Sequence, residues 1–245
     1  MRSIVHRGRR LAFSATRGLE PGVVFLGGLR SDMTGTKALA LEEWCREEGR
    51  SFLRLDYSGH GASDGRFEEG TIGEWLGDAL AVIAAATRGP QVLVGSSMGG
   101  WIALLIARDR PDLVAGLVTI AAAPDFTEDG YWAAFDPAQR RALEMEGQVI
   151  VSSEYGDPYV ITRALIEEGR DRLVLRDPLA LRMPVRLLQG TADAAVPATT
   201  AVRLLDHLDA ADARLTLLRG EDHRFSSTDA LALIHRDVAD VLARA

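Results

Sequence analysis

The sequence has one cysteine and no apolar run of the roughly 18 residues that a membrane span requires. Cys45 has no second cysteine with which to form an intrachain disulfide. Its position beside Trp44, in a stretch of helical period, predicts a packed thiol. Chains without disulfides are typical of reducing compartments. We therefore expect a cytoplasmic protein without a membrane span.

Positive charge is scarce relative to negative charge. The 28 lysines and arginines are outnumbered by 35 acidic residues, which gives a net charge of −7. Because phosphate electrostatics dominate nucleic-acid binding, we do not expect nucleic acid as a partner. The first nineteen residues are rich in arginine and free of acids, as a transit peptide would be, but Leu11, Phe13 and Ala15 alternate with smaller or polar neighbours. We expect this segment to be folded protein.

Short apolar runs alternate with segments of helical period along the 245 residues, a length that suits one α/β domain. The expected strands are 23–26, 52–55, 92–94, 117–120, 185–188 and 215–218. The expected helices are 37–48, 72–87, 101–108, 198–208 and 229–245. Alternation of this kind predicts an α/β fold with a mostly parallel central sheet covered by helices on both faces.

The alternation breaks once, between Pro124 and Pro184. Helices are expected there at 137–146 and 158–169, with an extended piece around 149–151. We interpret residues 124–183 as a small helical cap inserted into the strand order. The predicted organisation is thus a single domain, 1–245, that carries this cap.

The stretch Gly95-Ser96-Ser97-Met98-Gly99 matches the pattern G-x-S-x-G. An apolar strand runs into it and a strongly apolar helix leaves it, which is the context of a nucleophile elbow. A strained serine in such a turn needs small residues two positions before and after it, and both are glycine. Ser97 is therefore the expected nucleophile, and an incidental serine in a glycine-rich turn is the alternative.

A serine nucleophile needs an imidazole base and a carboxylate that orients the base. His223 follows the last expected strand and precedes the last helix, whereas His6, His207 and His235 fall in a strand and two helices, and His60 lies in a glycine-rich loop. Asp193 follows the strand at 185–188 in a turn bracketed by glycine and proline. Serine, aspartate and histidine then occur in the chain order of an α/β-hydrolase triad.

The choice of acid stays open on position alone. Asp125 follows the strand at 117–120 and is a rival, while Asp222 is a poorer one because it adjoins the histidine that it would have to face. Asp193 itself is also compatible with a helix cap or a turn former.

The loop Gly27-Gly28-Leu29-Arg30 follows the strand at 23–26 and lets backbone approach a substrate closely. We expect the oxyanion hole to be formed by the N–H groups of Leu29 and Met98, with a plain glycine turn as the alternative for Leu29. The sequence contains no dinucleotide loop, phosphate loop or cluster of metal ligands. Cofactor-free chemistry is therefore expected.

These motifs resemble those of the α/β-hydrolase family, in which D-x-x-G-x-G-x-S loops such as 56–63 accompany the elbow. Stretches 35–40, 56–59, 93–101, 143–147 and 222–224 are most similar to the mitochondrial branch that comprises palmitoyl-protein thioesterases and acyl-glucuronide esterases. The resemblance implies a triad of Ser97, Asp193 and His223, and so favours Asp193 over Asp125. One departure concerns the oxyanion loop, where that branch has a proline and an aromatic at the positions of Gly27 and Leu29.

The expected activity is hydrolysis of a carboxylic ester or acyl thioester, on a small molecule or an acylated protein, through an acyl-enzyme on Ser97. Arg30 could meet a carboxylate such as that of a glucuronide, and solvation is the alternative. Cap aromatics could line an acyl groove or pack within the cap: Tyr131, Trp132, Phe135, Tyr155 and Tyr159. An aminopeptidase or amidase of the same fold, and a non-catalytic binding protein, are the competing hypotheses.

Overall fold

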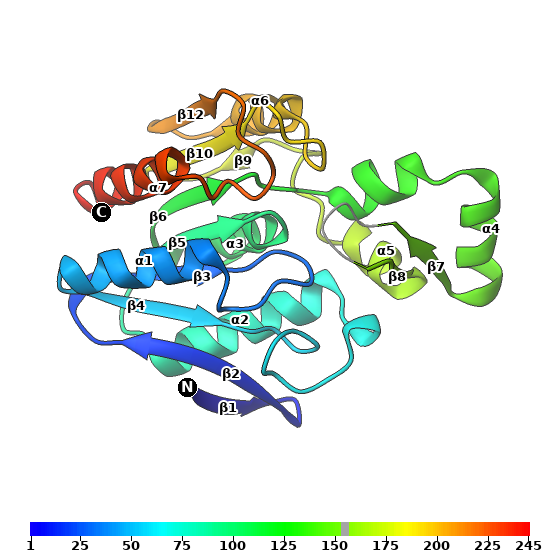
Figure 1. The fold of residues 1–245 in the computed structure, drawn as a ribbon, viewed down its shortest axis with the longest axis horizontal. Helices are drawn as coiled ribbons and strands as arrows, with labels where there is room; N and C mark the ends of the chain where they lie inside the picture. The colour runs from blue at the N-terminus through cyan, green and yellow to red at the C-terminus, as the bar shows by residue number, and fades with distance from the viewer. Residues whose placement is uncertain (153–156) are drawn as a thin grey trace.

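The computed structural model describes residues 1–152 and 157–245, which are built around an eight-stranded sheet (Figure 1). Its strands lie in the order β1 (Arg2–His6), β2 (Arg9–Thr16), β4 (Arg50–Leu55), β3 (Leu19–Leu26), β5 (Gln91–Ser96), β6 (Val114–Ile120), β10 (Val185–Gly190) and β12 (Ala213–Leu218). The pairs β1–β2 and β2–β4 are antiparallel, and all pairs from β4 to β12 are parallel. The expected α/β fold is confirmed, and the first nineteen residues are folded.

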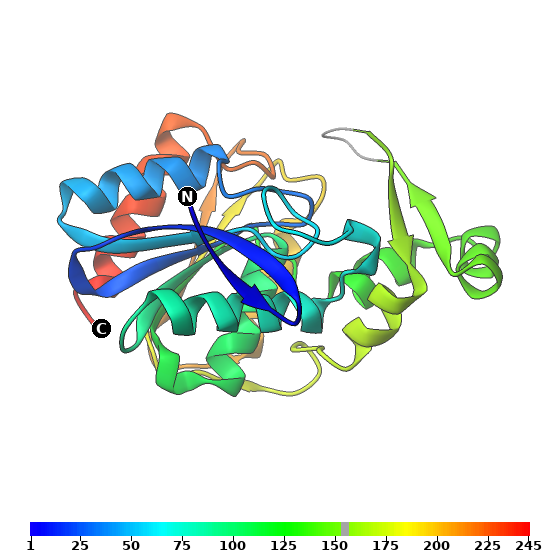
Figure 2. The same cartoon turned by 90° about the horizontal axis from the view of Figure 1, so that it is seen from below.

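Helices cover both faces of the sheet (Figure 2). Helices α1 (Thr36–Glu47) and α7 (Thr228–Leu242) lie on one face, and α2 (Ile72–Ala86), α3 (Met98–Asp109) and α6 (Ala198–His207) on the other. The period of two in a strand explains the two cores. In β3, Val23 and Phe25 pack toward α1 and α7, whereas Val24 and Leu26 pack toward α2 and α3. Both faces of the sheet are therefore apolar.

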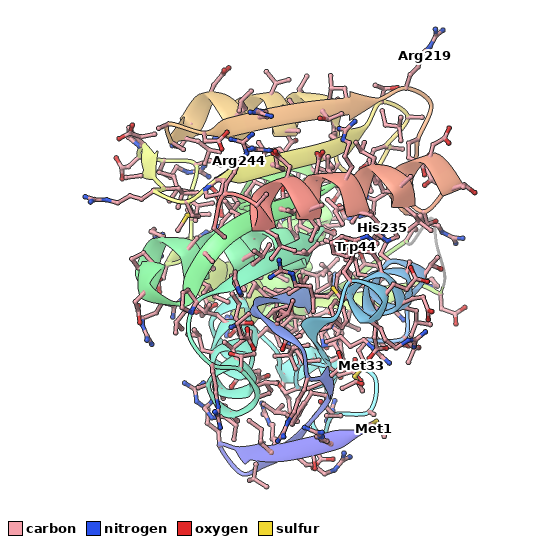
Figure 3. The ribbon with its side chains drawn as sticks, turned by 90° about the vertical axis from the view of Figure 1, so that its left-hand side faces the viewer. Met1, Met33, Trp44, Arg219, His235 and Arg244 are labelled. Carbon is pink, nitrogen blue, oxygen red and sulfur yellow. The ribbon has the colours of Figure 1, made fainter. Side chains whose placement is uncertain are left out.

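The two helices on the first face contact each other through an aromatic pair. Trp44 of α1 stacks on His235 of α7 with ring centroids 5.6 Å apart. The two residues are labelled beside each other in Figure 3. Cys45, the next residue, is fully buried, and burial raises the pKa of its thiol to about 12. The prediction of a packed thiol is confirmed.

Residues 126–170 lie beyond the carboxyl ends of the parallel strands (Figure 1). They form a π-helix η3 (Phe126–Trp132), α4 (Pro137–Glu146), β7 (Gln148–Val151), β8 (Tyr159–Thr162) and α5 (Arg163–Arg170). The chain then returns to the sheet, where β9 (Leu179–Ala180) pairs with β11 (Leu208–Asp209). Short 3-10 turns occupy η1 (Phe67–Glu69) and η2 (Pro111–Leu113). The division into one domain with a cap at 124–183 stays a prediction.

The helix expected at 158–169 is wrong in its first turn. Residues 159–162 form β8, which pairs antiparallel with β7, and the helix begins at Arg163. Three consecutive β-branched residues, Val160, Ile161 and Thr162, favour the extended conformation. Thr162 then caps α5 by accepting a hydrogen bond from the Leu165 amide.

Candidate active site

Ser97 stands at the sharp turn between β5 and α3. Its backbone has φ 55° and ψ −119°, a strained conformation for a residue with a side chain. A Cβ atom at Gly95 would lie 2.3 Å from the carbonyl oxygen of Gly99, and one at Gly99 would lie 2.1 Å from that of Leu26. Both glycines are therefore required by backbone that passes beside them, as the sequence pattern predicted.

The structure brings Ser97, His223 and Asp193 into one line of hydrogen bonds. Ser97 Oγ lies 3.1 Å from His223 Nε2, and His223 Nδ1 lies 2.8 Å from Asp193 Oδ2. These residues are far apart in the sequence and come from the loops after β5, β12 and β10. A nucleophile, a base and an orienting carboxylate in hydrogen-bonding sequence can transfer a proton from the hydroxyl to the imidazole.

Asp193 is held as a carboxylate. Burial raises the pKa of its side chain, but hydrogen bonds from His223, the Val196 amide and Gln189 outweigh that effect and leave the pKa below its ordinary value. The Val196 and Ala195 amides donate to Oδ1 at 2.7 and 3.0 Å, and Gln189 Nε2 donates to Oδ2 at 2.9 Å. The carboxylate orientation is thus fixed from three sides.

The loops that carry Asp193 and His223 are bonded to each other. The Ala192 amide donates to the Glu221 carbonyl at 3.0 Å, and the Gly220 amide donates to Thr191 Oγ1 at 2.9 Å. A Cβ atom at Gly190 would lie 2.2 Å from the Glu221 carbonyl oxygen, so glycine is needed for this approach. The two side chains are consequently positioned as one unit.

The rival acid Asp125 is hydrogen-bonded to residues 174–176. It is fully buried, and its carboxylate accepts hydrogen bonds from the Val174 and Leu175 amides at 2.8 and 2.9 Å and from Arg176 Nη1 at 3.1 Å. These contacts join the start of the 124–183 segment to its end. Asp222, the weaker rival, accepts from the Arg224 amide at 2.9 Å. Asp193 is the acid whose bond to the His223 ring the structure shows.

The loop after β3 passes directly beside Ser97. A Cβ atom at Gly28 would lie 3.2 Å from Ser97 Cβ, so the close approach predicted for this glycine is present. Leu29 and Met98 both line the cavity in front of Ser97. Within residues 1–152 and 157–245, neither backbone N–H donates to a protein acceptor. Met98 is the first residue of α3, whose opening amides have no intrahelical partner.

The cavity in front of Ser97 has a volume of about 720 Å³. Of the aromatics expected for an acyl groove, Tyr131 and Tyr159 line it and their hydroxyls contact each other. Phe126, which the sequence analysis did not single out, also lines it. Trp132 and Phe135 are not among the described residues of its wall, and Tyr155 lies outside the residues that the structure describes. The expected groove therefore involves only part of the predicted set.

Arg30 joins the oxyanion loop to the segment beyond the sheet. Its Nη1 donates to the Asp157 carbonyl at 2.9 Å, and its guanidinium lies 4.8 Å from the centre of the Tyr159 ring. Arg30 also lines the cavity, which leaves a contact with substrate open to it. Arg30 is exposed, so solvation, the alternative considered from the sequence, also stays open.

His60 supports the same loop and was missed as a site residue. Its Nε2 accepts a hydrogen bond from the Arg30 amide at 3.1 Å, and its Nδ1 donates to the Ser58 carbonyl at 3.1 Å. Burial lowers the pKa of His60, which favours the neutral ring that can accept this bond. The ring is edge-on to Tyr57, Phe67 and Trp75. Its glycine-rich setting gave no sign of a contact with Arg30.

Comparison with known proteins places these features in a family. The family model described as serine aminopeptidase, S33, matches residues 21–179. The chain belongs to this family.

Family relatives match over nearly the whole chain. The bovine mitochondrial palmitoyl-protein thioesterase ABHD10 is 38% identical over 237 residues, which are 95% of this chain and 76% of that protein. The crystal structure of a protein from Agrobacterium vitis S4 is 42% identical, with a TM-score of 0.93 and 98% of each chain covered. Mouse ABHD10 is 34% identical with a TM-score of 0.91, covering 99% of this chain and 98% of that one. The resemblance identified from the sequence is confirmed, and the chain is a hydrolase.

The family relationship does not confirm the cytoplasmic setting, because the ABHD10 relatives are named as mitochondrial. No helix within the described residues is long and apolar enough to span a membrane. The same described residues contain no group of three or more histidine, cysteine or acidic side chains suited to a metal ion.

Proposed function

We propose that this chain is a serine hydrolase that cleaves carboxylic esters or acyl thioesters through an acyl-enzyme on Ser97. The observation that carries the proposal is the continuous relay from Ser97 Oγ through the two ring nitrogens of His223 to Asp193 Oδ2, at 3.1 and 2.8 Å. The names of the thioesterase relatives support ester and thioester chemistry.

In the acylation step, Ser97 Oγ attacks the acyl carbonyl carbon while His223 Nε2 takes the hydroxyl proton. Asp193 holds the His223 Nδ1 proton and stabilises the imidazolium that forms. His223 then delivers the proton to the departing oxygen or sulfur, the bond to the leaving group breaks, and the acyl group remains on Ser97. Water activated by His223 attacks this ester in the second half of the cycle and releases the carboxylic acid.

The oxyanion of each tetrahedral intermediate would be bound by the amides of Leu29 and Met98. Both residues line the cavity beside Ser97, and neither backbone amide donates to a described protein acceptor. Donors fixed before the reaction stabilise developing negative charge without reorganisation, and losing one such donor costs about 10²–10³ in kcat in other enzymes.

For the substrate, we propose an acylated protein or a small acyl ester, with the acyl chain along Phe126, Tyr131 and Tyr159. These apolar surfaces line the cavity on the side of the 124–183 segment. An acyl glucuronide is the alternative small ester, with Arg30 at its carboxylate. Matched thioesters of increasing acyl length test whether the acyl chain binds in this groove. If it does, kcat/KM should rise with acyl length. Equal kcat/KM values for all lengths would contradict the groove.

The test of the mechanism is labelling with a fluorophosphonate probe, with the adduct located by mass spectrometry. We expect an adduct on Ser97, turnover of p-nitrophenyl and acyl-thioester substrates, and loss of both in Ser97→Ala. A folded protein that neither labels nor turns over activated esters would contradict the proposal and revive a non-catalytic binding protein.

Aminopeptidase or amidase activity is the second candidate, because the matching family model carries that description. Recognition of a free amine calls for acidic side chains, and the described residues that line the cavity include Arg30 and Lys37 but no carboxylate. Aminoacyl p-nitroanilides tested beside p-nitrophenyl esters would separate the two activities.

We further propose that residues 124–183 act as a cap on a single hydrolase domain and that the protein works in the cytoplasm. The single cysteine, which is buried, supports a reducing compartment. Fractionation of the native host cells, with compartment markers, tests the location.

A further inference from the structure

Lys37 is the only lysine in the chain, whose other 27 basic residues are arginines. It lies in the first turn of α1 and lines the cavity that contains Ser97. Lysine differs from arginine in being a compact point charge on a flexible stem. The one side chain of this kind is thus placed at the candidate active site.

One neutral group of the described residues, a backbone carbonyl, is bonded to the Lys37 ammonium. Nζ donates a hydrogen bond to the carbonyl of Arg224, the residue after His223. It forms no ion pair with any carboxylate of the described residues. Burial lowers the pKa of Lys37 to about 8, and the charges of Asp222 and Glu221 offset this only in part. A bound anion would supply the counter-charge that the protein does not.

The acids near Lys37 are engaged elsewhere. Asp222 accepts from the Arg224 amide, and Glu221 accepts from the Ser226 and Ser227 amides. Asp193 is bonded to His223, and Asp32, on the loop before α1, accepts from Thr34. The nearby cation is Arg224, whose charge lowers the Lys37 pKa.

A second cavity of about 270 Å³ opens beside Lys37. It shares Gly28, Ser31, Lys37, Ser96 and Arg224 with the larger cavity, so the two are neighbours.

Three residues with hydroxyl side chains line this second cavity: Ser31, Thr36 and Ser226. Over the described parts of the chain, none of these three hydroxyls has a protein hydrogen-bond partner. Hydroxyl donors around one ammonium suit a tetrahedral oxyanion, because lysine binds phosphate as a point charge while the hydroxyls donate to its other oxygens.

The position of Lys37 relates it to the leaving group. In the proposed reaction His223 delivers a proton to the departing oxygen or sulfur, so the leaving group must lie against the His223 loop. Lys37 binds the main chain of that loop at Arg224.

We propose that the second cavity binds a phosphate carried by the leaving group of the substrate, with Lys37 as its ionic partner. This inference rests on the proposed hydrolase function and adds a substrate class to it: acyl esters or thioesters of a phosphorylated alcohol or thiol.

The test compares octanoyl thioesters that differ only in the leaving group. The probes are 2-mercaptoethyl phosphate, neutral 2-mercaptoethanol, 3-mercaptopropionate and 4′-phosphopantetheine. We expect kcat/KM for at least one phosphate substrate to exceed that of the neutral thioester about tenfold, mainly through KM, because such binding is shared by ground and transition states. The short and long phosphate substrates distinguish a small phosphorylated thiol from a phosphopantetheine.

Lys37→Met should remove this advantage, so that the phosphate and neutral thioesters then react with equal kcat/KM, and Lys37→Arg should keep part of it. Arg219→Met is the matched control for net charge, because Arg219 is exposed and points away from the molecule (Figure 3). The advantage should be largest between about pH 6, where the phosphate gains its second charge, and about pH 8, above which Lys37 loses its proton.

Equal rates for phosphate and neutral substrates would overturn the inference while the hydrolase function stands. An equal gain in kcat/KM with the carboxylate probe would show that the site binds any anion regardless of its geometry, and the phosphate assignment would fail. A phosphate advantage that persists undiminished in Lys37→Met would show that another group binds the phosphate, and would likewise overturn it.

Discussion

The Arg30 amide donates a hydrogen bond to Nε2 of His60 over 3.1 Å, and this contact fixes the residue next to Leu29. The other ring nitrogen of His60, Nδ1, donates a hydrogen bond to the Ser58 carbonyl. His60 is thus placed to set the backbone of the oxyanion loop without touching the substrate.

His60→Phe should lower kcat for ester hydrolysis about tenfold or more, with little change in KM. Phenylalanine fits the aromatic surroundings of His60 but cannot accept the Arg30 amide, so the Leu29 donor would lose its alignment. Steady-state kinetics on a p-nitrophenyl ester provide the measurement. His60→Gln, which keeps an acceptor, should recover part of kcat; equal loss in both variants would argue for a purely structural role.

Asp193→Asn should reduce kcat about 10³–10⁴-fold, because an amide in this position favours the wrong tautomer of the histidine. Folding should be retained, since the Val196 and Ala195 amides can still donate to the side-chain oxygen. Circular dichroism and single-turnover kinetics check the two halves of this prediction. A near wild-type kcat in this variant would show that Asp193 is not the carboxylate that orients His223.

Asp125→Ala should behave in the opposite way, with little change in kcat at low temperature and a loss of about 3 kcal/mol in the free energy of unfolding. The substitution leaves the buried Val174 and Leu175 amides without their acceptor, and each such group costs about 1–3 kcal/mol. Urea unfolding measures the loss, and fluorophosphonate labelling reports the active site. Abolished labelling in a folded variant would reinstate Asp125 as the acid.

Lys37→Met should stabilise the fold at pH 7. The folded-state pKa of Lys37 is lowered from 10.5 to about 8, so burying the charge costs about 3 kcal/mol below pH 8. Loss of the hydrogen bond to the Arg224 carbonyl offsets about 1 kcal/mol of the gain.

The stability gap between Lys37→Met and the wild type has a defined pH dependence. The difference in the free energy of unfolding should be largest below pH 8 and should decrease as pH rises toward 10.5, because the wild type then folds with an uncharged lysine. Thermal unfolding across this range measures it. A gap that widens with pH would contradict the assigned cause.

The elements that the sequence predicts well are those whose pattern is local. Strand β5, the elbow at Ser97 and helix α3 follow from a buried run, two glycines and an apolar helix, all within twenty residues. His223 and Asp193 were predicted because each follows a strand at the carboxyl edge of the sheet, where such loops meet.

What the sequence does not reveal depends on distant partners. The bond between His60 and Arg30 spans thirty positions, and no pattern in either loop encodes it. Asp125 could not be excluded until the amides of Val174 and Leu175 were found on its carboxylate. Strand β8 was predicted as the first turn of a helix although residues 160–162 are β-branched, and its antiparallel pairing with β7 decides the extended conformation.

The contacts of Asp125 gather the entry and the exit of the 124–183 segment at one point. A replacement segment grafted between positions 126 and 173 would therefore have to return two backbone amides to one carboxylate, and would also have to meet the partners that Arg30 and Gly73 have in this segment. Chimeras that exchange this segment between relatives, with Asp125 and residues 174–176 retained, would allow acyl preference to be redesigned while Ser97, Asp193 and His223 stay in place.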